Sequence, residues 1–146
     1  MLNSDYKEML LLLQKFDVEF MLIGAYALAY HGVPRSTGDI DFFINCTPEN
    51  SKKVYRALVE FGAPVSEIDE LYLAQYGNMF QIGVAPCRID IITQIDGVLF
   101  QNANKVDVEI EGVVIPVISK SDFIKNKRAA GRHKDLADIE SLESGS

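Results

Sequence analysis

The sequence is poor in cysteine and in long hydrophobic runs, and both scarcities argue against whole classes of protein. Cys46 and Cys87 are its only cysteines, and neither has histidine or cysteine neighbours at ligand spacing, which argues against a zinc site. Each lies in an apolar run, so we expect buried, reduced thiols. The N-terminal region has no basic segment, and its longest apolar run, 9–13, is too short for a signal core or a membrane span. We therefore expect a cytoplasmic protein with no membrane partner.

Basic residues are also scarce, with 14 lysines and arginines against 21 acidic residues and a net charge of −7. Non-specific binding of nucleic acid depends on neutralising phosphates, so this balance argues against it. The sequence contains no GxxxxGK[ST] phosphate loop and no serine in a nucleophile elbow. A P-loop kinase and a Ser-His-Asp hydrolase are therefore poorly supported.

Hydrophobic residues, at 48% of the chain, are abundant enough for a sizeable core. No repeat or interdomain linker interrupts residues 1–146, and a chain of this length predicts one domain, with 143–146 as a flexible tail. Helices are expected between and around strands at 20–23, 39–45, 80–84 and 87–92 and a hairpin at 106–118. Thr47, Pro48 and Gly62 mark the start and end of one helix. This order predicts an α/β (α+β) fold in which helices pack against a mixed β-sheet.

Three aspartates on two predicted strands are the strongest candidates for a functional site. Asp39 and Asp41 lie in the run GDIDFFI, and Asp90 lies in RIDII. Residues two apart on a strand point to the same face, roughly 6.6 Å apart, so Asp39 and Asp41 can converge on one divalent ion or on a pair of ions. Their neighbours are strongly apolar, and an ionised carboxylate beside a core is costly unless it is paired or binds metal. A purely structural interpretation remains open, in which Asp39 caps its strand, Asp41 is solvated and Asp90 pairs with Arg88.

Other candidates lie in the segments that flank these strands. Gly24 ends the first strand and precedes a helical segment, where backbone N–H groups can cradle phosphate, although glycine is equally typical of a tight turn. Arg35 suits a phosphate ligand but also fits a solvated loop, and Thr37 either joins it or simply ends that loop. The segment 125–134 holds five of the 14 basic residues and either binds phosphates or forms a solvated face.

The order of these residues resembles that of the polymerase-β-like nucleotidyltransferase superfamily. Its pattern is a small-residue turn, a carboxylate pair on the next strand and a third carboxylate on a later one, here Gly24-Ala25, Asp39-Ile40-Asp41 and Asp90. The stretch 20–44 is more narrowly similar to small bacterial nucleotidyltransferase-like proteins, among them relatives of abortive-infection toxins. Lys127 and Arg132 lie in a C-terminal segment similar to one common in those proteins.

The resemblance implies a nucleotidyltransferase (polymerase-β palm-like) fold and transfer of a nucleoside monophosphate from an NTP, with ATP expected. It implies that Asp39, Asp41 and Asp90 bind Mg²⁺ or Mn²⁺. It also implies that Asp90 accepts the proton that the acceptor hydroxyl loses. The nucleotide contacts that it implies are Gly24, Ala25, Arg35, Thr37, Lys127 and Arg132. Members of the family usually have glycine or serine where this chain has Ala25, so one possible hydroxyl contact to phosphate is missing.

The acceptor and the role of the protein stay open on the sequence alone. A small molecule, an RNA end or a protein hydroxyl would serve as acceptor, and a chain this short would need a partner protein or a second copy to recognise it. The missing hydroxyl at Ala25 and the small size also suit a catalytically impaired nucleotide-binding module in a toxin–antitoxin or other regulatory pair. A third possibility is a structural interaction domain that inherited the fold.

Overall fold

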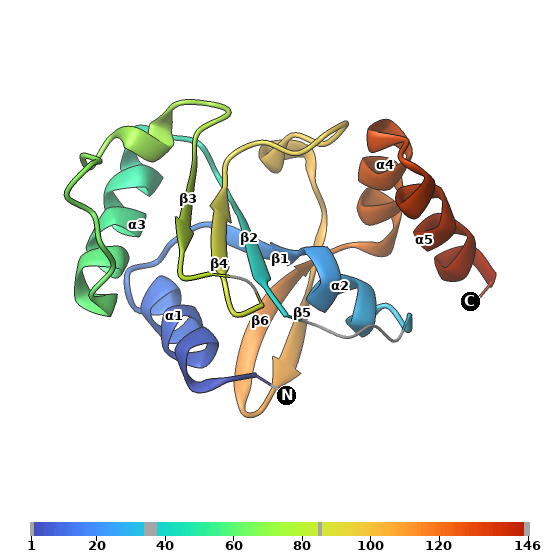
Figure 1. Ribbon diagram of the computed structural model, residues 1–146, viewed down its shortest axis with the longest axis horizontal. Coiled ribbons are helices and arrows are strands. Elements are labelled where there is room, and N and C mark those ends of the chain that lie inside the picture. The colour runs from blue at the N-terminus through green and yellow to red at the C-terminus, as the bar shows by residue number, and fades with distance from the viewer. Residues whose placement is uncertain (1, 34–37, 85, 145–146) are drawn as a thin grey trace.

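The computed structural model describes residues 2–33, 38–84 and 86–144, in which helices and strands are mixed along the chain (Figure 1). Arg35 and Thr37, two of the predicted ligand residues, lie outside the described residues. The helices are α1 (Ser4–Lys15), α2 (Gly24–Tyr30), α3 (Pro48–Phe61), α4 (Lys120–Ala130) and α5 (His133–Ser144), with short 3₁₀ turns at Tyr72–Ala74 and Phe100–Asn102. The strands are β1 (Phe20–Ile23), β2 (Ile40–Ile44), β3 (Met79–Ile82), β4 (Ile89–Ile92), β5 (Lys105–Ile110) and β6 (Val113–Ile118).

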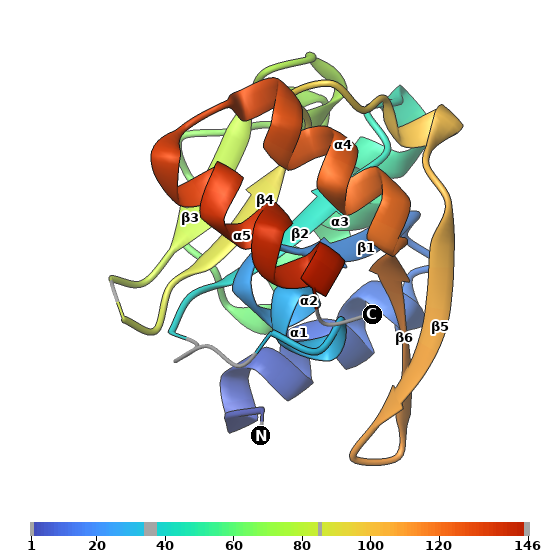
Figure 2. The same cartoon turned by 90° about the vertical axis from the view of Figure 1, so that its right-hand side faces the viewer.

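The six strands form one mixed sheet in the order β3-β4-β2-β1-β6-β5. β2 is parallel to β4 and antiparallel to β1, while β1 is parallel to β6. β3 and β5 pair antiparallel with β4 and β6 and form the two edges. α1 and α3 cover one face of the sheet, and the α4–α5 pair lies on the opposite side (Figures 1 and 2). The mixed sheet with helices packed against it, predicted from the sequence, is therefore confirmed.

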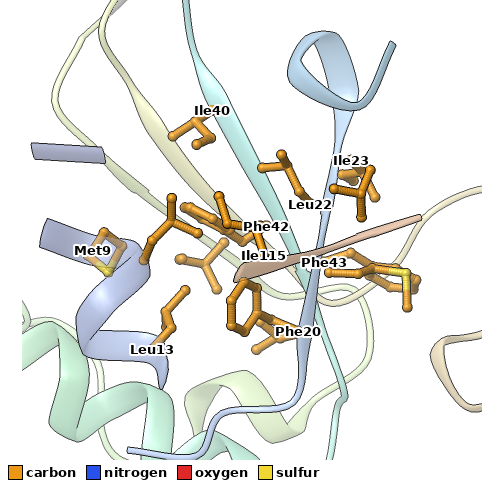
Figure 3. Packing of buried hydrophobic residues seen from close by; sticks show 14 of the residues in the cluster. Met9, Leu13, Phe20, Leu22, Ile23, Ile40, Phe42, Phe43 and Ile115 are labelled. Carbon is orange, nitrogen blue, oxygen red and sulfur yellow. The ribbon is translucent and has the colours of Figure 1, made fainter. Parts of the chain in front are cut away.

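The apolar core decides which face of the sheet the carboxylates take. Met9 and Leu13 of α1 face Phe20 of β1 and Phe42 of β2 (Figure 3). The two phenylalanine rings meet edge to face with their centroids 5.8 Å apart, a favoured aromatic geometry. Side chains alternate along a strand, so Asp41, next to Phe42, points to the other face. Burial of the aromatic residues against α1 thus turns Asp41 toward the side on which α4 and α5 lie.

Helix ends follow the capping signals in the sequence. The Thr47 hydroxyl accepts a hydrogen bond from a backbone N–H in the first turn of α3, Pro48 is the first residue of that helix, and Gly62 closes it at φ 88°. Ser119 caps α4 in the same way, and Gly131 ends it at φ 66°. A left-handed C-cap is relaxed for glycine and strained for most other residues. Gly131 therefore separates α4 from α5 and lets the two helices pack against each other.

The predicted limits of the two strands around the turn that precedes Arg88 are wrong by a few residues. β3 ends at Ile82 because Gly83 adopts a φ of 83°, and the N–H of Cys87 then donates to the carbonyl of Val84 at 3.0 Å. This turn takes Cys87 out of the sheet, so β4 begins two residues later than predicted. Cys87 is consequently exposed, in contrast to the buried thiol that the sequence predicts.

Three further expectations concern burial, the chain end and membranes. Cys46 follows β2 and is a free, half-buried thiol, so the prediction that it is buried is also wrong.

α5 continues through Ser144, two residues into the segment 143–146 expected as a tail, and 145 and 146 lie outside the described residues. Among the residues that the structure describes, no helix combines the length and the apolar character needed to cross a bilayer.

Tyr6 of α1 ties the first helix to the segments that enter β2 and β4. Its side chain is buried, and its hydroxyl donates to the carbonyl of Gly38 at 2.6 Å and lies 3.4 Å from that of Arg88. Burial raises the pKa of Tyr6 to about 12, so the hydroxyl keeps its proton at any ordinary pH. Because Gly38 and Arg88 stand just before the two strands that carry aspartates, Tyr6 helps to set the relative height of those strands.

We expect Tyr6→Phe to lower the free energy of unfolding by about 1–2 kcal/mol, because the buried carbonyl of Gly38 would lose its donor. Urea unfolding followed by circular dichroism measures this loss. Tyr30→Phe, at a side chain that is largely exposed, is the control and should change the same quantity by less than about 0.5 kcal/mol. Equal, small losses in both variants would show that the hydroxyl of Tyr6 does not tie these segments together.

Candidate active site

β2 and β4 bring two of the predicted carboxylates side by side. Asp41 and Asp90 are partners in the parallel ladder, and on its other side Asp41 is the partner of Ile23 in β1. Asp90 is buried, Asp41 is half-buried, and the two carboxyl groups share a hydrogen bond. Asp39 lies just before β2 rather than within it, which corrects the predicted start of that strand.

Arg88 connects these carboxylates. Its backbone N–H donates to Asp39 Oδ1 at 2.9 Å, and its Nη2 lies 3.4 Å from Asp39 Oδ2. Its Nε donates to Asp90 Oδ1 at 2.8 Å, and Nη2 donates to Asp90 Oδ2 at 3.2 Å. All four carboxylate oxygens of Asp39 and Asp90 therefore contact one arginine. The Asp90–Arg88 pair expected under the structural interpretation of the sequence is thus present, within a larger cluster.

The carboxyl of Asp41 lies beside negative charges that Arg88 compensates only in part. Burial is the largest influence on its pKa, followed by the hydrogen bond and negative charge of Asp90 and then by the charge of Asp39. Each of these disfavours the ionised carboxylate. Together they raise the pKa of Asp41 from 3.8 to about 7, although Arg88 acts in the opposite direction. A cation brought to this carboxyl would favour its ionised form.

The raised pKa of Asp41 makes the stability of the metal-free protein depend on pH. The folded carboxyl keeps its proton up to about pH 7, whereas the unfolded one loses it near 3.8. The contribution of the protonated Asp41 carboxyl to the free energy of unfolding is therefore complete below the pKa of the unfolded state. It is lost as the pH rises through the pKa of the folded state, by up to about 1 kcal/mol per pH unit. Asp41→Asn cannot ionise, so we expect its stability relative to the unaltered protein to increase as the pH is raised across this range.

Urea unfolding in EDTA at a series of pH values measures that difference. Asp107→Asn, at an exposed position on β5, is the matched control, and its stability should run parallel to that of the unaltered protein. If Asp41→Asn also ran parallel, the carboxyl of Asp41 would not hold a proton in the folded state.

A pocket of about 320 Å³ adjoins the carboxylates. Acidic residues from the β2 side meet basic residues from α4 and from the start of α5 across this pocket. Among the residues that line it are Gly24, Ala25, Asp39, Asp41, Lys127, Arg132 and Lys134. The structure thus brings six of the predicted site residues to one pocket. Asp90 lies next to Asp41 on the neighbouring strand β4.

Gly24 provides space for the carboxylate of Asp41. Its φ is 71°, and a Cβ atom at this position would lie 2.2 Å from Asp41 Oδ2. Both the left-handed backbone and the close approach require glycine. α2, which begins at Gly24, has only seven residues, so its dipole adds little to the binding of an anion.

The cations on the helical side of the pocket are themselves held by buried carboxylates. Arg132 Nε donates to Asp135 Oδ2 at 2.6 Å, and Lys127 Nζ lies 3.4 Å from Asp135 Oδ1 and 3.8 Å from Asp138 Oδ2. The hydrogen bond from Arg132 is the main cause that lowers the pKa of Asp135 to about 2. Lys127 is mostly buried, whereas 66% of the Arg132 side chain is exposed. Lys127 is therefore fixed in place, and the guanidinium of Arg132 stays within reach of a ligand.

Arg88 and Lys134 are the site residues that the sequence indicates least clearly. The sequence suggests Arg88 only as a structural partner of Asp90 and Lys134 only as one member of a basic segment. A signal for Arg88 exists, because residues two apart near a strand share a face. Lys134 has no such signal, since its place at the pocket depends on how α5 packs.

The donor atoms suit a hard divalent cation, because Mg²⁺ prefers carboxylate oxygens. In the part of the chain that the structure describes, however, no group of three or more histidine, cysteine, aspartate or glutamate side chains is arranged to hold a metal ion. The guanidinium of Arg88 engages oxygens of Asp39 and Asp90. The three aspartates fit a divalent cation in the chemistry of their donor atoms.

No protein-family model matches the sequence, and no curated protein matches it significantly. Solved structures do resemble it. A presumed nucleotidyltransferase from Thermotoga maritima (TM1012) has a TM-score of 0.63 and 18% identity, over 99% of this chain and 94% of its own. The lincosamide antibiotic adenylyltransferase LnuA, solved with lincomycin bound, has a TM-score of 0.64 and 19% identity, over 100% of this chain and 99% of its own.

An antigenic nucleotidyltransferase-like protein from Paracoccidioides brasiliensis has a TM-score of 0.59 and 18% identity, over 94% of this chain and 74% of its own. Identities this low speak for the architecture rather than for activity. The shared arrangement of strands and helices, together with the mixed sheet described above, shows that this chain has the nucleotidyltransferase fold.

Proposed function

We propose that the protein is a metal-dependent nucleotidyltransferase that transfers the nucleoside monophosphate of an NTP, with ATP the expected donor, to a hydroxyl-bearing acceptor. The observation that supports this most is the pairing of Asp41 with Asp90 beside a pocket lined with lysine and arginine. Carboxylates that hold metal and cations that hold phosphates are what transfer at a phosphorus centre requires.

The carboxylates would divide the work as follows. Asp39, Asp41 and Asp90 would hold Mg²⁺ or Mn²⁺, which when bound neutralises charge on the attacking and leaving oxygens. Asp90 would also accept the proton that the acceptor hydroxyl loses. Gly24 would keep the carboxylate of Asp41 free of steric contact, because any side chain there would meet it.

The cations would orient the triphosphate. Arg132 uses Nε and Nη2 to bond Asp135, and the remaining N–H donors of its largely exposed guanidinium suit phosphate oxygens. Lys134 adds a flexible charge at the same pocket. Lys127, held by two buried aspartates, contributes a positive potential at a fixed point. Arg35 and Thr37, outside the described residues, belong to the same proposal as further phosphate ligands.

A small molecule or a protein hydroxyl suits the acceptor role better than a long nucleic acid does. The net charge of −7 would repel an extended phosphate backbone. LnuA, which shares the fold, is a lincosamide antibiotic adenylyltransferase that was solved with lincomycin bound, and this supports a small-molecule acceptor. A partner protein or a second copy of the chain would complete the acceptor side.

A second candidate is a nucleotide-binding module without turnover, acting in a toxin–antitoxin or other regulatory pair. Two observations favour it. Arg88 pairs with the carboxylates of Asp39 and Asp90, and Ala25 at the pocket lacks the hydroxyl that serine would offer. In this case the pocket would bind an NTP that the carboxylates cannot process.

Calorimetric titration with ATP, GTP, CTP and UTP in the presence of Mg²⁺, followed by an assay of pyrophosphate release, separates the two. Binding with release in the presence of hydroxyl acceptors supports the transferase. Binding without release for every acceptor tried supports the module. A nucleotide at about a hundred times its Kd should raise the free energy of unfolding by about 2.7 kcal/mol, and the absence of stabilisation by any nucleotide would contradict both.

A further inference from the structure

We propose that Arg88 is a built-in competitor of the metal. In the metal-free protein its guanidinium takes the carboxylate oxygens that a divalent cation needs, and the cation binds only when the Arg88 side chain swings away. This inference rests on the proposed function, because that function is what calls for a cation at Asp39, Asp41 and Asp90.

The contacts of Arg88 and those of a metal ion would use the same atoms. Both oxygens of Asp90 accept hydrogen bonds from its guanidinium, at 2.8 and 3.2 Å, and Asp39 Oδ2 lies 3.4 Å away. A fork of this kind satisfies carboxylates well, because it takes one lone pair on each Asp90 oxygen and places a positive charge beside the others. A cation on the same oxygens would lie beside the positive guanidinium and be repelled by it, so Arg88 in this position disfavours metal binding at Asp90.

The backbone of Arg88 is anchored, whereas its side chain has room to move. Its N–H donates to Asp39 Oδ1 at 2.9 Å, and its carbonyl accepts from the N–H of Ile40 at 2.9 Å and lies near the Tyr6 hydroxyl. The side chain is 33% exposed, against 6% for that of Asp90. A change of rotamer would thus carry the guanidinium toward solvent without disturbing β4.

Electrostatics explain why the fold would keep such a residue. Asp41 and Asp90 are partners in the ladder and Asp39 lies close by, so three negative charges would face one another in a partly buried site. Carboxylates this close repel one another unless a cation joins them. Arg88 supplies that cation while the protein folds, before any metal is bound.

Calorimetric titration of the whole chain with Mn²⁺ alone at about pH 8, without nucleotide, tests the proposal. The proteins compared are the unaltered chain, Arg88→Gln, Arg88→Lys and Arg128→Gln. We expect Arg88→Gln to bind Mn²⁺ about tenfold more tightly than the unaltered chain, because the carboxylate oxygens of Asp39 and Asp90 would no longer have a positively charged partner within the protein. Arg88→Lys keeps the charge but loses the fork, so its affinity should lie between the two.

Arg128→Gln is the matched control for the loss of one positive charge. Arg128 pairs with Glu143 at 3.5 Å, and both side chains are largely exposed. Its Mn²⁺ affinity should equal that of the unaltered chain. Thermal unfolding gives a second readout, since Mn²⁺ should raise the Tm of Arg88→Gln by more than that of the unaltered chain. If Arg88→Gln fails to fold, Arg88→Lys alone decides, and an affinity equal to that of the unaltered chain overturns the proposal.

The outcomes separate this inference from the proposed function. Equal or weaker Mn²⁺ binding by Arg88→Gln, with binding by the unaltered chain, overturns the competition and leaves the transferase standing. Binding by Arg88→Gln alone supports the competition and contradicts the transferase, because the natural site would then be closed to metal. Binding by neither protein contradicts both.

Discussion

Under the proposed function, nucleotidyl transfer should fall on the order of 10³-fold or more in Asp41→Asn and in Asp90→Asn, because each change removes a carboxylate charge that would hold the metal. The two residues are direct partners across β2 and β4 and share a hydrogen bond. Asparagine has nearly the same shape, so the ladder between the strands should survive while the negative charge is lost. Asp39→Asn should have a similar effect, since Asp39 lines the same pocket.

Pyrophosphate release at saturating ATP and Mg²⁺ measures this loss. Asp107→Asn, exposed on the edge strand β5, is the matched control and should retain full turnover. Circular dichroism of each variant shows whether the fold is intact. Turnover close to normal in Asp41→Asn and Asp90→Asn, in folded protein, would mean that the carboxylates do not take part and that the fold serves another purpose.

The second large effect is on stability, and it concerns the buried ion pairs between α4 and α5. We expect Asp135→Asn to lower the free energy of unfolding by about 2–4 kcal/mol, because a buried charge pair is costly to break when one partner stays behind. Asp135 is fully buried and contacts both Lys127 and Arg132. The loss should stop short of the largest values, since Asp138 still lies 3.8 Å from Lys127.

Urea unfolding near neutral pH measures this loss, and Glu143→Gln is its control. Glu143 pairs with Arg128 at the surface, where an ion pair contributes less than about 1 kcal/mol. The pH dependence gives a further check with a definite sign. Because the folded pKa of Asp135 is lowered to about 2 from 3.8, its contribution is present above the higher value and is lost as the pH falls toward the lower one. A variant as stable as the unaltered chain throughout would show that these pairs are not what holds α4 and α5 together.

The pH signatures of Asp41 and Asp135 are opposite, and the difference reports what each carboxylate does. Asp135 has cations as partners, so folding favours its charge. Asp41 has carboxylates as partners and is half-buried, so folding favours its neutral form. A carboxyl that the fold leaves short of positive charge is typical of a functional site rather than of a structural pair.

Much of the fold could be predicted because the signals for it are local. Thr47, Pro48 and Gly62 predict the start and end of one helix from capping preferences. In the structure, Thr47 and Gly62 are the caps of α3 and Pro48 is its first residue. The apolar run at 20–23 is a buried strand with the predicted limits. Strand ends near Cys87 were harder to predict, because a turn that begins with a glycine at positive φ overrides the apolar pattern.

In the candidate site, too, the local sequence predicts some features and packing decides the others. Residue types and spacing point to Asp39, Asp41 and Asp90 as a group, since an ionised carboxylate among apolar strand residues is costly in free energy unless it is paired or binds metal. Nothing local shows that Asp41 and Asp90 are direct partners, because 48 residues lie between them, including α3, a 3₁₀ turn and β3. That partnership depends on β2 and β4 being parallel neighbours, which is decided by packing.

The amino-acid sequence by itself determined the alternation of helices and strands, their caps and the carboxylates that stand out in apolar surroundings, because each of these is encoded within a few residues. The tertiary structure alone decided the strand order, the space that Gly24 leaves for Asp41, and the contact of Arg88 with Asp39 in addition to Asp90. It also decided that Lys127 is held by buried aspartates while Arg132 remains largely exposed. The physical reason is that charges and close contacts act through space, and only the packed sheet and helices set those distances.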